Sequence, residues 1–383
     1  MKQPVYLDYQ ATTPMDERVL AAVMPYLTGR FGNPHSATHR YGWEGEAALD
    51  VARGQVAGLI GADEKEIIFT SGATEANNMA LKGVMEAWGH KRPGLVTVAT
   101  EHKCVLESAA WCARHGAELT VIGVDSDGRV RMDELEAAVS ERTALVSVMA
   151  VNNEIGVIQP LREIGAIAKR HGAIFHTDAA QAFGKIPLDV DVLGIDLMSL
   201  SGHKIYGPKG VGALYRRDER RVALQPFMSG GGQEGGYRSG TQAPALVAGF
   251  GKAAAIAAEE MAQEEGRLST LMARLKGRLW EALPDLILNG HPNERWVGNL
   301  NLSVPGVDGD LLLAELSPLA LSSGAACASA VSGPSYVLAA IGRTGAEAKA
   351  ALRIGIGRFT TDEEVDFATE TLINTIAKLK DRL

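Results

Sequence analysis

Short apolar runs rich in β-branched residues alternate with segments of helical periodicity through the first two thirds of the chain. The apolar runs predict strands at residues 67–70, 95–99, 119–122, 144–151, 173–176, 196–200 and 211–215. The intervening periodic segments predict helices at 43–59, 75–85, 102–114, 132–139 and 161–170, and we expect another helix to start at Pro14. This alternation is typical of an α/β fold with a doubly wound, mostly parallel sheet that helices cover on both faces.

The pattern changes after residue 241. Two long helices are predicted at 243–265 and 267–282, followed by short strands at 286–288, 297–304 and 319–321 and an amphipathic helix at 362–383. We therefore predict a large domain over residues 15–261. A smaller α+β domain is expected to combine residues 1–14 with residues 262–383.

Composition narrows the kind of protein. The 383 residues are too many for one hydrophobic core, which agrees with two domains. The formal net charge of −8 argues against nucleic acid or an anionic membrane as the main partner. No apolar run is long enough to span a membrane and the N-terminus lacks a signal peptide's apolar stretch, so we expect a cytoplasmic protein.

Cysteines are few and scattered. Cys104, Cys112 and Cys327 do not make a disulfide framework or a metal cluster, so no metal site is expected. Cys104 and Cys112 lie in a predicted helix and are interpreted as buried structural cysteines.

Lys204 follows the predicted strand 196–200, in a stretch that reads Ser-Gly-His-Lys. At the exit of a buried strand water is scarce, and the pKa of an amine falls toward neutrality. Such a lysine can form a Schiff base with an aldehyde cofactor. A solvated loop lysine is the alternative, and for an isolated lysine it would be the better interpretation.

Polar residues also follow the other predicted strands, where a doubly wound sheet places its ligands. Residues 71–74, Ser-Gly-Ala-Thr, form a small-residue turn at a helix start, which suits a phosphate but also serves as a plain cap. His102 could stack on a planar ring or bond to backbone. Asn153 could bind a carboxylate or form a turn.

Asp178 follows strand 173–176 and would be costly to bury unless a cation partners it. A protonated pyridine nitrogen would serve, with Gln181 near a phenolic oxygen of the same ring; the alternative is that Asp178 caps the next helix. Ser201 and His203 could close the phosphate site, and a glycine-rich loop at 230–240 ends in the hydroxyl of Thr241. Together these groups indicate a site for pyridoxal 5'-phosphate (PLP).

With these residues identified, the chain resembles the cysteine desulfurases of the NifS/IscS type, PLP enzymes of fold type I in the class V aminotransferase family. The resemblance covers nearly the whole chain. It rests on the collinear motifs LDYQATTP, GNPHS, FTSGATEANN, TEHK, NNEIGVIQP, DAAQ, DLMSLSGHKIYGPKGVGALY, GGGQE, RSGT, SSGAACAS, PSYVL and GRFTT.

The resemblance implies a role for each candidate residue. Lys204 would carry PLP as a Schiff base, Asp178 would pair with the pyridine nitrogen, and Gln181 would contact the ring hydroxyl. His102 would stack on the ring and shuttle protons. The substrate carboxylate would be held by Asn153 and Arg353, with Arg358 the rival that we interpret as structural. The phosphate would be held by Ala73, Thr74, Ser201, His203 and, from the other subunit of a homodimer, Thr241.

Cys327 lies among small residues in Ser-Ser-Gly-Ala-Ala-Cys-Ala-Ser, which favours an accessible thiol on a mobile loop; a buried structural cysteine is the alternative. By resemblance, its thiolate attacks the sulfur of L-cysteine, retains a persulfide and releases L-alanine. The sulfur would pass to an acceptor such as an iron–sulfur scaffold or a tRNA-thiolation protein.

Two departures leave alternatives open. Residues 351–356 lack the serine-rich pattern common in the family, although Arg353 is present. The chain also ends at Leu383 without the further tail with which housekeeping members dock a scaffold, so a dedicated scaffold of the NifS kind is equally compatible. Rival functions are an aminotransferase, a selenocysteine lyase, a PLP-binding regulator and a sulfur-relay scaffold.

Overall fold

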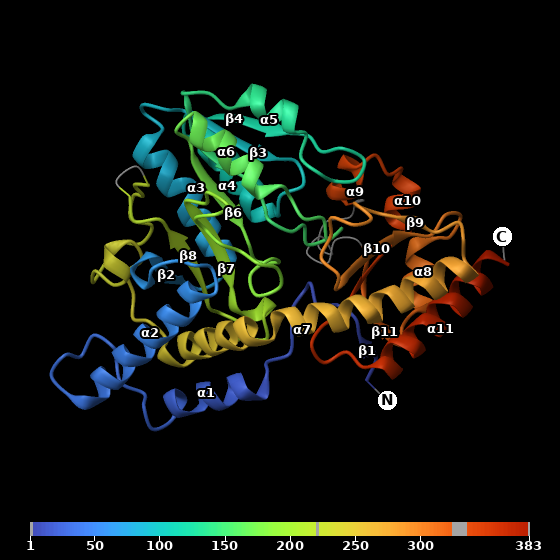
Figure 1. Ribbon diagram of the computed structural model, residues 1–383, viewed down its shortest axis with the longest axis horizontal. Coiled ribbons are helices and arrows are strands. Elements are labelled where there is room, and N and C mark those ends of the chain that lie inside the picture. The colour runs from blue at the N-terminus through green and yellow to red at the C-terminus, as the bar shows by residue number, and fades with distance from the viewer. Residues whose placement is uncertain (1–2, 220–221, 324–334, 382–383) are drawn as a thin grey trace.

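A seven-stranded sheet forms the centre of the larger part of the molecule (Figure 1). The computed structural model describes residues 3–219, 222–323 and 335–381. The strands lie in the order β2-β8-β7-β6-β5-β3-β4. Their bounds are β2 Ile67–Thr70, β3 Gly94–Val98, β4 Glu118–Ile122, β5 Thr143–Ser147, β6 Ile174–Asp178, β7 Leu197–Ser201 and β8 Gly212–Arg216.

The direction of the strands confirms the predicted fold class. Strands β7, β6, β5, β3 and β4 pair in parallel, whereas β8 runs antiparallel to both β7 and β2. The carboxyl ends of β5, β6 and β7 therefore meet at one edge of the sheet. The chain thus has the α/β fold with a mostly parallel seven-stranded sheet that the apolar runs predicted.

Helices cover both faces of this sheet, which explains why its strands, apart from the edge strand β4, are largely buried. On one face, side chains such as Ile68 and Leu145 pack with Met79 and Val105 from α3 (Ala73–Trp88) and α4 (Lys103–Arg114). On the other face, alternate residues such as Phe175 join one large core. That core includes residues of α1 (Glu17–Leu27), α2 (Arg40–Gly58), α5 (Met132–Ala138), α6 (Leu161–Arg170) and α7 (Pro244–Ala282).

The C-terminal part contains a smaller antiparallel sheet in the order β12-β13-β10-β9. The N-terminal strand β1 (Val5–Tyr6) pairs in parallel with β11 (Leu319–Ala320), so the first residues lie beside the C-terminal part (Figure 1). The division into domains at 14/15 and 261/262 stays a prediction. The remaining elements are β9 Ile287–Leu288, β10 Asn299–Ser303, α8 Gly309–Glu315, β12 Ser322–Ser323, α9 Tyr336–Ala340, α10 Gly345–Lys349, β13 Ala351–Gly355 and α11 Asp362–Lys380.

Helix α7 corrects the prediction of two helices separated near Gly266. It is one helix of 39 residues that runs from the large sheet to α11 (Figure 1). Gly266 interrupts the hydrophobic pattern but not the backbone, because it is exposed and no atom lies within 4 Å of where its Cβ would be. Burial of Phe250 on one side of it and Leu275 on the other stabilises the continuous helix.

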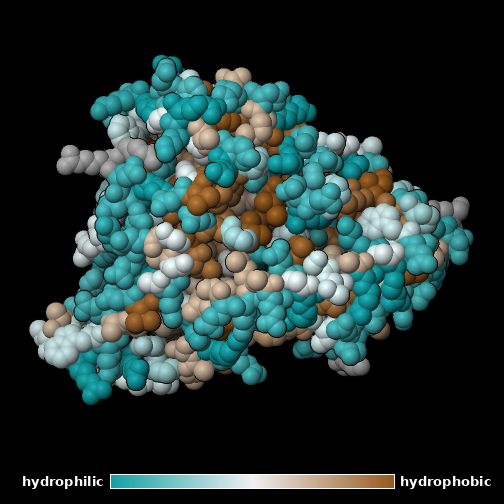
Figure 2. Space-filling view, in the orientation of Figure 1, coloured by the Kyte–Doolittle hydropathy of each residue, from teal (hydrophilic) through white to brown (hydrophobic). Residues whose placement is uncertain are grey.

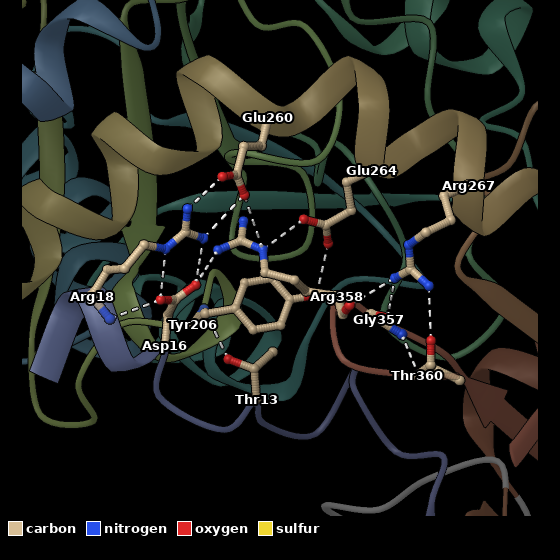
Figure 3. Close-up of polar contacts among 10 residues, drawn as sticks. All are labelled: Thr13, Asp16, Arg18, Tyr206, Glu260, Glu264, Arg267, Gly357, Arg358 and Thr360. Carbon is tan, nitrogen blue, oxygen red and sulfur yellow. Dashed lines mark hydrogen bonds and ion pairs between the residues drawn. The ribbon is translucent and has the colours of Figure 1, made fainter. Parts of the chain in front are cut away.

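The start of α1 also differs from the prediction. The helix begins at Glu17 rather than at Pro14, because the carboxylate of Asp16 caps it by accepting the amide N–H of Arg18 at 2.9 Å. Figure 3 shows that Asp16 also belongs to a network of charged side chains on three segments. Arg358 donates to Asp16 Oδ2 and to Glu264 Oε2, both at 2.9 Å, and lies 4.2 Å from the ring centre of Tyr206. The network ties α1 and α7 to the segment after β13.

The surface seen in Figure 2 is covered mainly by hydrophilic residues, and hydrophobic residues gather near its centre, between the large sheet and α7. Across the described ranges, no helix is both long and apolar enough to cross a membrane.

The continuity of α7 leads to a stability prediction. We expect Gly266→Ala to raise the free energy of unfolding by about 0.5–1 kcal/mol, because alanine restricts the unfolded chain and its Cβ meets open space. Gly251→Ala in the same helix is the control. Its Cβ would lie 2.5 Å from Ala52 Cα, so this variant should lose stability. Urea unfolding measures both, and a less stable Gly266→Ala would contradict the helical geometry.

Candidate active site

A cavity of about 580 Å³ lies at the carboxyl ends of β5, β6 and β7. The N-terminal residues 10–12 and β13 complete its wall. The cavity brings together, from segments far apart in the sequence, the predicted residues Ala73, Thr74, His102, Asn153, Asp178, Gln181, Ser201, His203, Lys204 and Arg353.

Two predicted residues are not part of this wall. Thr241 is exposed and lies just after the glycine-rich loop, outside the cavity of its own chain. Its contribution to the site of another subunit stays a prediction. Cys327 lies outside the described residues.

Lys204 is at the end of a short 3₁₀ turn, Gly202–Lys204, which directly follows β7. Its Nζ donates hydrogen bonds to the backbone carbonyl oxygens of Gln10 and, at 2.8 Å, Ala11. The same N-terminal segment is held by Thr13, whose N–H donates to the His203 carbonyl at 3.0 Å. Lys204 is therefore a half-buried cavity residue held by backbone, which contradicts the alternative of a solvated loop lysine.

The backbone just after Lys204 is fixed by Tyr206, which adopts the left-handed conformation with φ of +66°. That conformation is rare for a bulky side chain and persists only where neighbours hold it. Here the Tyr206 N–H donates to Thr13 Oγ1 at 2.9 Å, and its hydroxyl donates to Glu264 Oε1 at 2.8 Å (Figure 3). The network of Figure 3 thus supports the turn that carries Lys204.

Asp178 is the last residue of β6 and is buried in the cavity wall. It accepts hydrogen bonds from the side-chain amide of Asn77 at 2.7 Å and from the Ala180 N–H at 2.9 Å. Both donors are neutral. A buried carboxylate with neutral partners favours a cation in the adjacent cavity.

The start of α3 is the small-residue turn for which a phosphate was predicted. Its N-cap residue Gly72 has φ of +151° and makes no side-chain capping bond, so the first backbone N–H groups are not satisfied by a cap. Gly72, Ala73 and Thr74 all line the cavity. A 16-residue helix whose N-terminus opens on a cavity is suited to bind an anion.

His203 faces the same end of the cavity. Its Nδ1 lies 3.0 Å from Thr12 Oγ1. Burial, together with the positive charges of Lys204, Lys209 and Lys185, lowers the pKa of His203 to about 4. His203 is therefore neutral at pH 7, and the cations around it favour an anionic ligand.

His102 is the N-cap of α4, and its Nδ1 accepts the amide N–H of Cys104 at 3.3 Å. The neutral imidazole therefore carries its proton on Nε2. Cys104 does not fit the expectation of a buried structural cysteine: its half-buried thiol lines the cavity, 3.0 Å from His102 Nδ1. Cys112 does fit, because it lies in the core, where burial raises the pKa of its thiol to about 11.

Arg353 is the central residue of β13 and pairs across the sheet with Asn301 and Ser322. Its guanidinium donates to Asp8 Oδ1 at 2.7 Å and to the Asn153 carbonyl oxygen at 3.0 Å. Its buried Nε has no hydrogen-bond partner among the described residues. Arg353 therefore lines the cavity with one nitrogen unsatisfied, and its binding of a carboxylate stays a prediction, whereas Arg358 is held in the ion-pair network of Figure 3.

The sequence did not single out three residues that support this site: Asp8, Gln10 and Asn77. Asn77 left a weak signal, since it is a polar residue at a wholly buried position of α3. Asp8 and Gln10 lie in an extended segment whose contacts with Arg353, Gln181 and Lys204 have no local signature. Within the described ranges, no group of three or more His, Cys, Asp or Glu side chains could hold a metal ion.

Comparison with known proteins gives matches over almost the whole chain. A cysteine desulfurase of Homo sapiens is 54% identical over 379 residues, which are 99% of this chain and 83% of that protein. The cysteine desulfurase IscS of Rickettsia rickettsii is 50% identical over 377 residues, or 98% and 92% of the two chains. A solved structure of a NifS-like protein superposes with a TM-score of 0.91 at 35% identity, covering 98% of this chain and 100% of that one.

The family described as "Aminotransferase class-V" matches residues 5–367. This range includes the lysine turn after β7, the α3 N-terminus and the arginine of β13. The chain therefore belongs to the class V aminotransferase family.

Proposed function

We propose that the chain is a PLP-dependent cysteine desulfurase, which converts L-cysteine to L-alanine and keeps the sulfur as a persulfide on Cys327. The observation that carries the proposal is the convergence of Lys204, Asp178 and the uncapped α3 N-terminus on one cavity. Relatives named cysteine desulfurase, at 50% and 54% identity over nearly the full chain, direct the choice of reaction.

The donor set of the cavity fits PLP. Asp178 is a buried carboxylate that would hold a protonated pyridine nitrogen, and Gln181 would donate to the ring oxygen. The α3 N-terminus, Ser201 and His203 would hold the phosphate, and Lys204 is the amine that the aldehyde would reach. When bound, PLP withdraws electrons from the α-carbon of an amino acid, which makes the Cα proton removable.

The protein's own groups then bind the substrate and move its proton. Arg353, with Asn153, would hold the carboxylate of L-cysteine, and this contact would place Cα near Lys204 Nζ. Lys204 would take the Cα proton, while hydrogen bonds to the Gln10 and Ala11 carbonyls hold its amine in place. His102 would hold a proton at Nε2 within the same cavity.

Sulfur transfer needs a second nucleophile, for which we propose the thiolate of Cys327. It would form an S–S bond to the substrate sulfur as the Cβ–S bond breaks, and the electron pair of that bond would stay with the three-carbon skeleton. The skeleton would gain a proton at Cβ, regain one at Cα and leave as L-alanine. The persulfide would pass to an acceptor protein, for which we propose an iron–sulfur scaffold; a tRNA-thiolation protein and a cytoplasmic location stay predictions.

We further propose a homodimer in which Thr241 reaches the phosphate site of the partner subunit. The exposed position of Thr241 supports this arrangement, since its hydroxyl is not used in its own chain's cavity. Exposed apolar residues on α1 and the following loop, among them Leu20, Met24, Leu27 and Phe31, support a subunit interface.

The activity itself is the first test. The purified protein with PLP should form alanine from L-cysteine, and sulfide in the presence of a thiol reductant. Lys204→Ala should lose at least about a thousandfold in kcat, because it removes the amine that takes the Cα proton. Cys327→Ala should stop sulfide release, with Cys112→Ala as the unaffected control. Normal sulfide release by Cys327→Ala without added thiol would contradict the desulfurase assignment and favour a lyase.

The two arginines give a matched pair of variants. Arg353→Ala should raise KM for L-cysteine about tenfold or more, because it removes a charge-assisted contact with the carboxylate. Arg358→Met should leave KM unchanged and lower Tm, because it removes the cation that joins the carboxylates of Asp16 and Glu264. Steady-state kinetics and thermal unfolding separate the two effects. A raised KM in Arg358→Met, with an unchanged KM and a lowered Tm in Arg353→Ala, would mean that Arg358 binds the carboxylate and Arg353 is structural.

Mixed dimers test the role of Thr241. Neither Lys204→Ala nor Thr241→Ala homodimers should be fully active. In a hybrid of the two, one site would combine an intact Lys204 with an intact Thr241 from the partner subunit. Activity recovered on mixing and refolding would support the contribution across the interface. No recovery, with hybrid formation confirmed by native mass spectrometry, would place Thr241 in its own chain's site or outside both.

A further inference from the structure

A second lysine is buried behind the cavity, and none of the roles given above uses it. Lys185 lies in the turn after β6 and is only 8% exposed. Its Nζ lies 2.9 Å from Gln181 Oε1 and 4.6 Å from the ring centre of Trp296. Among the described residues, no carboxylate forms an ion pair with it. Burying an amine in this way costs stability, so its presence calls for a functional explanation.

The contact with Lys185 settles the orientation of the Gln181 amide. Amide oxygen and nitrogen atoms are told apart by their hydrogen bonds, and an ammonium group can only donate. Gln181 must therefore turn Oε1 toward Lys185 and Nε2 the opposite way. On that side Nε2 donates to the Gln10 carbonyl at 2.8 Å, and the same carbonyl accepts from Lys204 Nζ. One chain of hydrogen bonds thus joins the two lysines.

We propose that Lys185 is a positioning residue of the desulfurase reaction, which holds Gln181 with its amide nitrogen toward the ring oxygen of PLP. The inference rests on the proposed function, because it assumes that PLP occupies the cavity. Without Lys185 only the Gln10 carbonyl, which also accepts from Lys204, would hold the amide, and the amide would more easily turn over and present an oxygen to an oxygen. The ring would then lose a donor and gain a repulsive contact.

The positive charge of Lys185 also favours the reaction of Lys204 with the PLP aldehyde. Burial, together with the positive charges of Lys204 and Arg353 and against the opposing effect of Glu264, lowers the pKa of Lys185 to about 7. Because the repulsion is mutual, a cation at Lys185 also disfavours a proton on Lys204. The amine of Lys204 is then more often neutral, which is the form that reacts with an aldehyde.

A merely structural lysine would behave differently on substitution. Lys185→Met keeps the length of the side chain and its contact with Trp296 but removes the buried amine. If Lys185 only filled space or braced the turn, the variant should lose stability and nothing else. If Lys185 positions Gln181, the apoprotein should be as stable as the wild type or more stable, while its hold on PLP weakens.

The test measures PLP binding to the apoprotein and the pH titration of the visible absorbance of the loaded protein. We expect Lys185→Met to bind PLP about tenfold more weakly, because about this much affinity is lost with one hydrogen bond to the ring oxygen of the cofactor. The absorbance titration should move to higher pH, because a cation near Lys204 has been removed. Lys185→Arg, which keeps the charge and the donors, should recover part of both losses. Lys169→Met, on the exposed face of α6, is the control.

A double-mutant cycle with Gln181→Ala shows whether Lys185 acts through Gln181. The combined variant should bind PLP no more weakly than Gln181→Ala alone, since the group that Lys185 orients is already gone. The inference would be overturned if Lys185→Met bound PLP as tightly as the wild type and its absorbance titrated at the same pH. It would also be overturned if the losses of PLP affinity in the two single variants added in the combined variant. A wild-type apoprotein that neither binds PLP nor forms alanine from L-cysteine would overturn the proposed function as well.

Discussion

The contact between Lys204 and the N-terminal segment is the interaction on which the site depends. The carbonyl oxygens of Gln10 and Ala11 accept from its amine, and the amide of Thr13 donates to the carbonyl of the preceding residue, His203. The other end of this segment is anchored by the pairing of β1 with β11 and by the ion pair of Asp8 with Arg353. Residues 5–13 thus connect the lysine after β7 to the arginine of the small sheet.

The charges around the cavity favour an anionic ligand. Lys204, Lys209 and Lys185 all lower the pKa of His203, which shows how closely positive charge is gathered there. The carboxylates that line or adjoin the cavity already have partners: Asp178 accepts from neutral donors, Asp8 is paired with Arg353, and Glu75 is paired with Arg238. A phosphate at the α3 N-terminus and a substrate carboxylate at Arg353 would each reduce the repulsion among the buried cations. Ligand binding and stability are therefore expected to be linked.

Two arginines near the end of the chain illustrate how similar residues acquire different roles. Arg353 is in a strand, and its guanidinium points to a cavity that also contains Asn153. Arg358, five positions later, is packed over Tyr206 between the carboxylates of Asp16 and Glu264 (Figure 3). The second arrangement holds Tyr206 in its left-handed conformation, two residues after Lys204. An ion-pair network outside the cavity thus supports the geometry within it.

The sequence alone determined the sheet and the strand-end residues of the site. Apolar runs such as 67–70 must be buried on both faces, and in a parallel sheet the residues after each run meet at one edge, so Asp178 and Lys204 were expected together. Only the tertiary structure decided that α7 is continuous, that Cys104 lines the cavity, and that Asp8, Gln10 and Lys185 reach Arg353, Lys204 and Gln181. The physical reason is the range of the interactions. Periodicity reports burial within one element, whereas the contacts of Asp8 with Arg353 and of Gln10 with Lys204 join segments up to 345 residues apart, and no pattern local to either segment encodes them.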